Sequence, residues 1–338
     1  MARAGRYEYT IARLRAMERR LVEESTLLRI LDAEDLASAL KMLSETGYAS
    51  WLPEMKSDVD FDSLIEKELL FIYDQLRQFV PDKELLLLFR LPYDFHNVKV
   101  VLKSLFRQRR GQPRRWDLLT SLGSIPGDDL VTAIESEDYR TLPFGLAQLL
   151  PGCVAHWEQT QDLLEIERRL DRQLFKVMDE QVGKLELVGV AAWFKGRVDA
   201  ENLRTILRLR RFGFDQSLVE QFVHDGGAIS RERVLSLYAE PFEGWGRSVA
   251  YADVSRVFRE IENFEDPGTF LVELEKGLDE FITWLLGKSA YLPFAPENVL
   301  RYLWLKEMET RNLRILLVSK ASGMDRDVVR GLMRRDVA

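Results

Sequence analysis

Three histidines and one cysteine are the side chains of this sequence best suited to metal binding or nucleophilic chemistry: His96, His156, His224 and Cys153. Zinc sites need such residues, or carboxylates, at short fixed spacings such as HExxH, and no histidine here has that spacing. Gly287-Lys288-Ser289 matches the end of a phosphate-binding loop, but Ile282 stands where the first glycine is required. We therefore predict no catalytic residue, no metal and no cofactor, and a binding or mechanical role in place of an enzymatic one.

The most basic stretch runs from 107 to 115 and holds five arginines, interrupted by Gly111 and Pro113. It lacks the aromatic-rich sheet or recognition helix that nucleic-acid-binding folds place beside such charge. The whole chain carries a net charge of −7 and has a pI near 5.4, so it has no general attraction for nucleic acid or anionic lipid. We predict a loop or protein contact at this stretch and no nucleic-acid partner.

The composition is typical of a soluble protein with hydrophobic cores. The chain has 338 residues, of which 46% are apolar and 30% charged, which suits two or three packed units. A single cysteine suits a reducing compartment. The longest uncharged apolar run, about 187–194, is far shorter than the roughly 20 residues that span a bilayer, and no signal peptide is visible. We expect a cytoplasmic protein that meets a membrane only from outside.

Apolar residues recur at helical spacing along most of the chain, so we predict an all-α fold. One pattern occurs three times: asparagine, apolar, Lys or Arg, any residue, apolar, leucine, starting at Asn97, Asn202 and Asn312. On a helix its apolar positions form one stripe that faces a core, with the asparagine at the edge of the stripe. We interpret the asparagine as a structural residue that bonds a neighbouring backbone group, with direct ligand contact as the alternative.

The basic positions of this pattern lie about opposite the asparagine, on the side that we expect to face solvent. They come two and six residues after the asparagines: Lys99, Lys103, Arg204, Arg208 and Arg314. A solvated face and a surface that docks a partner both explain them, and we take these five as candidate partner-binding residues. Val318 replaces the second cation of the third copy, so the three copies cannot contact a partner identically.

A second pattern alternates with the first. It consists of an apolar residue, an acid three positions on, and apolar residues five and nine positions on, starting at Leu31, Ile125 and Ile229. We interpret it as a turn into a short helix whose acid lies near the helix N-terminus. Asn97 precedes Ile125 by 28 residues and Asn202 precedes Ile229 by 27, so the length of this connection is nearly fixed.

A further long helix is expected before each asparagine helix, beginning near residues 66, 167 and 275. We therefore divide the chain into three tandem, pseudo-symmetric helical units at about 1–115, 116–220 and 221–338. The chain ends too soon after Asn312 to provide the short helix of the third unit. The N-terminal helices can supply it, and would then close the three units into a ring or funnel.

Four stretches together resemble a known family: FHNVK at 95–99, VDAENLRT at 198–205, ETRNLR at 309–314 and LSETGY at 43–48. They are similar to the C subunit of archaeal and bacterial V/A-type ATP synthases, which is related to the d subunit of the eukaryotic vacuolar ATPase. The resemblance covers nearly the whole chain. It implies an all-helical, funnel-shaped protein of three similar units, present in one copy per complex and without an active site of its own.

The resemblance also implies partners. The narrow end of the funnel would seat on the proteolipid ring at the cytoplasmic face of the membrane, and its open end would receive the rotor shaft of subunits D and F. Torque would pass through the chain during ion transport or ATP synthesis, with membrane contact only through the ring. From the residues alone, the alternative is a soluble helical-repeat scaffold that binds a protein in its concave face. A helical enzyme is disfavoured because catalytic groups are missing.

Overall fold

Helices form the architecture throughout the part of the chain that the structure describes. The structure is a computed structural model, and it describes residues 6–261 and 266–335. The long helices are α4 (Phe61–Phe79), α5 (Glu84–Arg109), α8 (Leu163–Leu185), α9 (Val188–Arg211), α13 (Pro267–Gly287) and α14 (Glu297–Ser322). The predicted all-α class is confirmed for the described residues.

Shorter helices join and cover the long ones. They are α1 (Glu8–Glu18), α2 (Glu24–Asp32), α3 (Leu36–Leu43), α6 (Gly127–Glu135), α7 (Leu146–Thr160), α10 (Gln216–Val219), α11 (Arg231–Ala239), α12 (Phe242–Ser248) and α15 (Arg326–Leu332). Turns of 3₁₀ helix complete the set: η2 (Gly47–Ser50), η3 (Leu52–Glu54), η4 (Trp116–Leu118), η5 (Glu220–Phe222), η6 (Asp253–Arg259) and η7 (Lys288–Tyr291).

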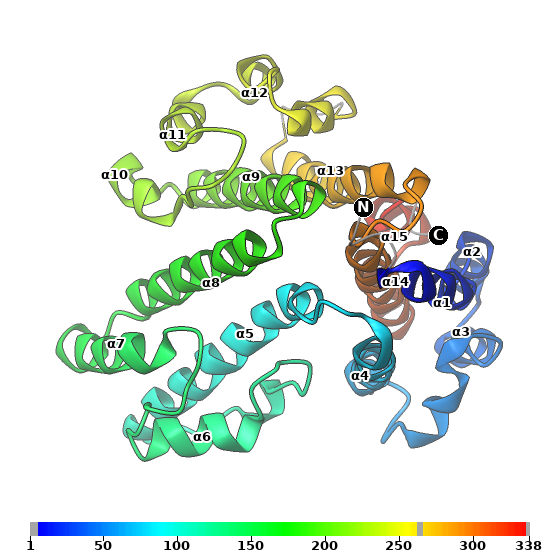
Figure 1. Cartoon of the computed structure of the whole chain (residues 1–338), viewed down its shortest axis with the longest axis horizontal. Helices are drawn as coiled ribbons and strands as arrows, with labels where there is room; N and C mark the ends of the chain where they lie inside the picture. The colour runs from blue at the N-terminus through cyan, green and yellow to red at the C-terminus, as the bar shows by residue number, and fades with distance from the viewer. Residues whose placement is uncertain (1–5, 262–265, 336–338) are drawn as a thin grey trace.

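The long helices follow one another around a common centre (Figure 1). Helices adjacent in the sequence form hairpins, α4 with α5, α8 with α9 and α13 with α14. Neighbouring hairpins meet where α5 packs on α8, where α9 packs on α13 and where α14 returns to α4. We call these three contacts the α5/α8, α9/α13 and α14/α4 joints.

The apolar stripe of each asparagine helix is buried, as its spacing predicts. Val98 and Leu102 on α5, Leu203 and Leu207 on α9, and Leu313 on α14 are all at most 1% exposed. Aromatic contacts extend the same core between hairpins: the Phe89 and Trp193 rings stack with centroids 5.6 Å apart and so link α5 to α9.

Each repeated asparagine binds one distant backbone residue through both halves of its side-chain amide. The pairs are Asn97 with Thr120, Asn202 with His224 and Asn312 with Arg334, at donor–acceptor distances between 2.7 and 3.0 Å. The bonded residue lies 23, 22 and 22 positions after the asparagine. The amide therefore supplies the donor and the acceptor that a partly buried peptide group needs.

An acid three residues before each asparagine fixes a second backbone segment. The Asp94 carboxylate accepts from Ile125 N at 2.8 Å, and the Asp199 carboxylate accepts from Ile229 N at 3.0 Å. These bonds hold the turns that lead into α6 and α11. The third acid, Glu309, accepts from Val22 N at 2.7 Å, which lies in the N-terminal segment.

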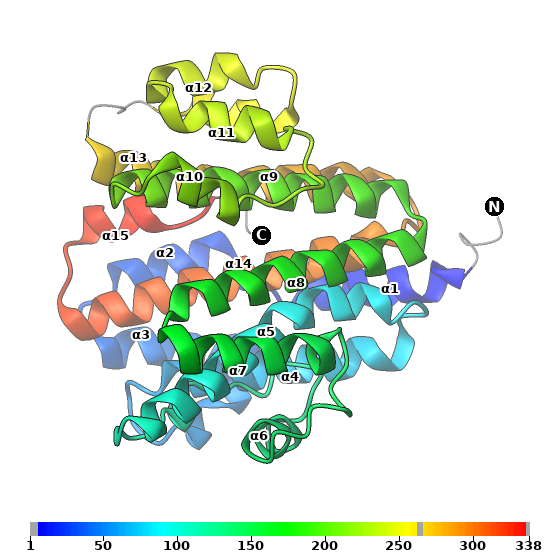
Figure 2. The same cartoon turned by 90° about the vertical axis from the view of Figure 1, so that its left-hand side faces the viewer.

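The N-terminal helices accordingly lie against the last long helix. Helices α2 and α3 pack on α14, and α2 also packs on α15, as Figure 2 shows. Lys320 Nζ donates to Ala33 O at 2.5 Å, and Arg326 Nε donates to Asp32 Oδ1 at 2.6 Å. Helices α2 and α3 therefore lie against the helix that carries Asn312.

Gly227 provides a test of the acid contacts. A Cβ at this position would lie 2.2 Å from Asp199 Oδ1, which is closer than any real contact of this kind. Gly227→Ala must therefore displace the carboxylate from Ala228 N and Ile229 N, and we expect the free energy of unfolding to fall by about 1–3 kcal/mol. Urea unfolding followed by far-UV circular dichroism measures the change.

Gly183→Ala is the matched control, because Gly183 lies inside α8 and nothing approaches the position within 4 Å. Here the substitution should stabilise the protein by ~0.5–1 kcal/mol, since alanine restricts the unfolded chain and favours the helix. Equal effects of the two substitutions would show that the close approach of Asp199 is not what stabilises this turn.

Candidate functional site

The basic side chains expected to face solvent reach carboxylates on the adjacent long helix. The pairs are Lys99–Asp171 and Lys103–Glu167 at the α5/α8 joint, and Arg204–Asp279 and Arg208–Glu275 at the α9/α13 joint. The expectation of a solvent face was wrong for Lys99 and Arg204, whose side chains are only 23% and 19% exposed. It failed because α5 packs sideways on α8 and α9 packs sideways on α13: the repeat pattern predicted these long helices but not that they cover the cations.

The two joints use the same register. In each joint the two cations are four residues apart on one helix, and the two acids are four residues apart on the other. The first cation of each pair (Lys99 or Arg204) binds the later acid, and the second cation binds the earlier one. Residues four apart lie on one face of a helix, so each joint carries two stacked ion pairs that we call an ion ladder. Lys99 Nζ lies 2.5 Å from Asp171 Oδ1, and Arg208 Nε donates to Glu275 Oε1 at 2.9 Å.

The α14/α4 joint has no equivalent ladder. Arg314 pairs with Asp62 at 2.7 Å, but the two side chains are 55% and 82% exposed. Val318 occupies the position of the second cation, and Glu66 accepts instead from Thr120 Oγ1 at 2.9 Å. This joint therefore depends on other contacts.

A buried ionic triad lies at this third joint. Lys306 Nζ on α14 is 2.8 Å from Glu68 Oε1 on α4 and 2.7 Å from Glu309 Oε1, with all three side chains at most 1% exposed. Although burial alone would lower the pKa of Lys306, the two carboxylates raise it, so the ammonium stays charged. Tyr48 Oη donates to Glu309 Oε1 at 2.7 Å and Trp51 Nε1 donates to Glu68 Oε2 at 2.8 Å. The triad thus ties the N-terminal segment to both helices of the joint.

Asp279 on α13 is a second point where several elements meet. Its carboxylate accepts from Arg334 Nε at 2.9 Å and from Arg311, and it lies 3.5 Å from Arg204 Nη2. Burial would raise the pKa of Asp279, but the three guanidinium groups lower it below its ordinary value. One carboxylate at 3% exposure therefore links α9, α13, α14 and the segment after α15.

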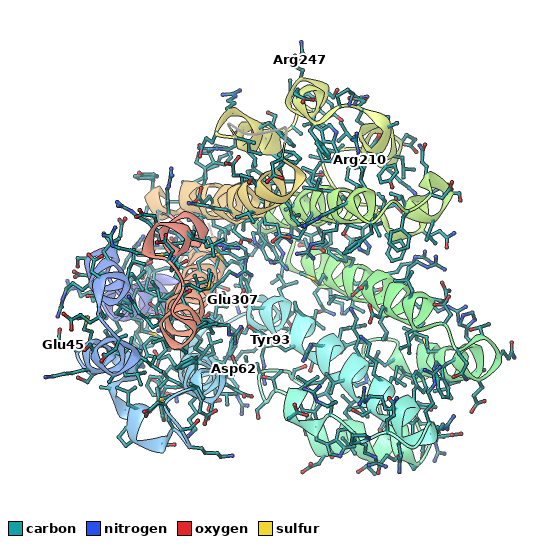
Figure 3. The ribbon with its side chains drawn as sticks, turned by 180° about the vertical axis from the view of Figure 1, so that it is seen from behind. Glu45, Asp62, Tyr93, Arg210, Arg247 and Glu307 are labelled. Carbon is teal, nitrogen blue, oxygen red and sulfur yellow. The ribbon has the colours of Figure 1, made fainter. Side chains whose placement is uncertain are left out.

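Next to Asp279, charged and polar side chains from three helices meet in the middle of the molecule. This central cluster consists of Tyr93 on α5, Arg197 and Glu201 on α9, and Glu307 and Arg311 on α14. Figure 3 shows Tyr93 and Glu307 facing each other from two helices. Burial raises the pKa of Glu307 to about 7, although Arg197 and Arg311 oppose the shift. The Arg197 guanidinium also lies over the Trp193 and Trp304 rings, at 5.9 and 5.7 Å.

The residues first considered for chemistry do not come together. His96 Nε2 lies 2.9 Å from Leu118 O, and the ring of His224 stacks on Phe175 with centroids 4.0 Å apart. Burial lowers the pKa of His224 to about 4 and raises the pKa of the Cys153 thiol. Among the residues with assigned positions, no group of three or more His, Cys, Asp or Glu side chains is arranged to hold a metal ion.

The basic stretch 107–115 is also internally paired. Arg109 contacts Glu137 at 2.9 Å and Glu158 at 2.5 Å, and Arg115 contacts Asp117 at 2.7 Å. The two Arg109 contacts hold the end of α5 to the segment after α6 and to α7. Within residues 6–261 and 266–335, no helix combines the length and the apolar composition that crossing a bilayer requires.

Removing the Asp279 charge tests the central packing. Asp279→Asn removes the buried carboxylate that Arg311 and Arg334 share, whereas Arg204 keeps Glu201 at 2.8 Å, and we expect a loss of about 3–5 kcal/mol in the free energy of unfolding. Chemical denaturation measures it. Asp138→Asn is the control, because Asp138 pairs with Arg140 in an exposed loop and its loss should leave the midpoint nearly unchanged. A small effect of Asp279→Asn would mean that the arginines find other partners.

The raised pKa of Glu307 predicts a pH dependence. The pKa of this carboxyl is higher in the folded than in the unfolded state. The free energy of unfolding therefore falls as pH rises from about 4.5 to about 7, because folding in that range requires either proton uptake or a buried negative charge. Glu307→Gln should therefore stabilise the protein by about 1–3 kcal/mol at pH 8 and by much less at pH 4.5. Melting curves at both pH values measure the difference. Glu45→Gln, at a side chain 60% exposed, should show no such dependence, and an equal pH response of both variants would contradict the assignment.

Comparison with known proteins identifies the family of this chain. Residues 10–332 match the family model described as ATP synthase (C/AC39) subunit. The C subunit of the V-type ATP synthase of Thermus thermophilus is 27% identical, with 96% of this chain and 97% of the relative covered. Its counterpart in the A-type ATP synthase of Methanocaldococcus jannaschii is 23% identical over 97% of this chain and 86% of the relative. The corresponding protein of the V-type sodium ATPase of Enterococcus hirae is 23% identical over 95% and 96%. The family predicted from the repeated motifs is confirmed: this chain belongs to the C/AC39 subunit family of the V/A-type ATP synthases.

Proposed function

We propose that this chain is the non-catalytic central-stalk subunit of a V/A-type rotary ATPase, and that it transmits torque between the D–F rotor shaft and the proteolipid ring. The observation that carries the proposal is the pair of ion ladders that fasten neighbouring helical hairpins, in a chain that matches the family over residues 10–332. One copy works per complex, at the cytoplasmic face of the membrane, and contacts the membrane only through the ring.

The proposal includes an architecture of three tandem, pseudo-symmetric units that form a funnel, at about 1–115, 116–220 and 221–338. Its support is the asparagine contact, which occurs three times and each time joins residues 22 or 23 positions apart, and the ion ladder, which occurs at two joints. In the third unit the N-terminal segment takes the place that the turns before α6 and α11 have in the other two, through the bond from Val22 N to Glu309.

A torque coupler needs resistance to twisting. Sliding α5 along α8 by one residue would separate both ion pairs of the ladder, Lys99–Asp171 and Lys103–Glu167. The close-packed apolar core beneath them would have to rearrange at the same time. The buried triad provides a third fixed contact at the α14/α4 joint, because separating the two helices would leave buried ionisable groups without their ionic partners. The three joints together favour rotation of the chain as one body.

The five candidate partner-binding residues divide into two groups. Lys99 and Arg204 are mostly covered and belong to the joints. Lys103, Arg208 and Arg314 have side chains 44%, 50% and 55% exposed, and these three are the cations that we propose for the partner surface. Exposed ion pairs contribute only ~0–1 kcal/mol, so a carboxylate of a partner can replace the internal one at little cost.

Affinity purification from detergent-solubilised membranes tests the proposed function. A tagged copy of the full chain should recover the shaft subunits D and F together with the proteolipid, identified by mass spectrometry. Recovery of the chain alone, or of soluble partners without shaft and proteolipid, would contradict the central-stalk role and favour the helical-repeat scaffold.

The proposed partner surface has its own test. The double variant Arg208→Glu/Arg314→Glu should reduce the recovery of these partners at least tenfold while its melting temperature stays within a few degrees of the wild type, because both side chains are about half exposed. Arg140→Glu, at a side chain 88% exposed in a distant loop, is the control and should not change recovery. Full recovery with the double variant would exclude these residues from the contact.

A further inference from the structure

A cavity of about 860 Å³ lies apart from the ion ladders, between η6, α13, η7 and the first part of α14. Its charged lining is predominantly basic, with four cations, Arg256, Lys288, Arg301 and Arg335, and two acids, Glu260 and Glu280. The whole chain has a net charge of −7, so an excess of cations in one cavity runs against the average charge of the molecule. Neither the ladders nor the central cluster uses these cations.

Two of the cations share one aromatic ring. Arg256 Cζ lies 4.0 Å from the centroid of the Trp284 ring, and Lys288 Nζ lies 3.9 Å from the same centroid. The two positive groups therefore lie within about 8 Å of each other, where like charges repel. The ring attracts each of them, but it does not neutralise either.

Internal acids only partly neutralise this cavity. Lys288 pairs with Asp253 at 3.1 Å, and Arg301 pairs with Glu18 at 2.5 Å. Arg256 and Arg335 make no ion pair with any residue that the structure describes. Glu280, one of the two acids in the lining, accepts a hydrogen bond from the backbone N–H of Arg335 at 2.9 Å. Two guanidinium groups with a polar lining thus remain available to a carboxylate from outside.

An exposed apolar edge borders the cavity. Tyr291 lines it and is 90% exposed, and the next residue, Leu292, is 56% exposed. Tyr291 ends η7 and Leu292 follows it, in the connection between α13 and α14. Large apolar side chains at such exposure beside a charged pocket are typical of a protein contact, in which a central apolar anchor is surrounded by polar pairs.

From this combination we infer that the cavity between η6, α13 and α14 is a docking site for an acidic segment of a partner protein, with apolar residues among its acids. The partner's carboxylates pair with Arg256 and Arg335, which can each form two parallel hydrogen bonds to a carboxylate. The partner's apolar side chains pack on Tyr291 and Leu292. The inference goes beyond the proposed function and does not depend on it.

Fluorescence anisotropy with the full-length chain tests the inference. The probe is a fluorescein-labelled 12-residue peptide of alternating glutamate and leucine, and the control peptide has lysine in place of glutamate. The acidic peptide should bind, with an affinity that falls as salt is raised, and the basic peptide should not. The variant Arg256→Gln/Arg335→Gln should weaken binding of the acidic peptide at least tenfold, whereas Arg140→Gln, at an exposed and distant arginine, should leave it unchanged.

The indole N–H signal of Trp284 gives a local readout by ¹H–¹⁵N NMR, with Trp284→Phe used to assign it. It should shift when the acidic peptide binds and stay fixed with the basic one. Equal affinity of the wild type and the Arg256→Gln/Arg335→Gln variant, or an unmoved Trp284 signal, would overturn the inference. Complete displacement of the peptide by equimolar tripolyphosphate would also overturn it, because the site would then be one for small phosphate ligands.

Discussion

Buried peptide groups need hydrogen-bond partners, and in this fold three asparagine side chains supply them. A primary amide carries one acceptor oxygen and one donor nitrogen, so it can pair with the N–H and the C=O of a single residue as a strand neighbour would. Asn97, Asn202 and Asn312 do this for segments that return to the core 22 or 23 residues later. Aspartate at these positions would lose the donor, and a shorter side chain would not reach both groups.

Charge compensation determines how the hairpins fit together. The ladders at the α5/α8 and α9/α13 joints match four cations to four acids, and Asp279 adds contacts to Arg311 and Arg334. Isolated buried charge is costly, whereas a paired arrangement is stable only in the register that completes the pairs. The ladders thus contribute more to the choice of register than to the free energy of folding. The triad around Lys306 has the same effect at the third joint, with fewer and more deeply buried groups.

The sequence predicted features that depend on residues close in the chain, and missed those that depend on packing between distant helices. Helical periodicity located the buried stripes of α5, α9 and α14 correctly. It placed Arg204 toward solvent, because a helical wheel cannot reveal that α13 covers that side. A signal for the ladders was present: Glu167 and Asp171, like Glu275 and Asp279, are four residues apart on a long helix and match the spacing of the cations. The sequence carried no such signal for the burial of Lys306. Because α14 is enclosed on nearly all sides, its buried residues do not form a single apolar stripe that would mark which positions are covered.

The bond between Val22 and Glu309 has a consequence for the newly made chain. Its two partners are 287 residues apart, so the first helices leave the ribosome long before their binding site exists. At roughly 5–20 residues per second this interval is about 15–60 s, which is long compared with the folding of a single helical hairpin. The apolar surface that α2 and α3 later bury against α14 must remain uncovered, or be covered by a chaperone, until α14 has been synthesised.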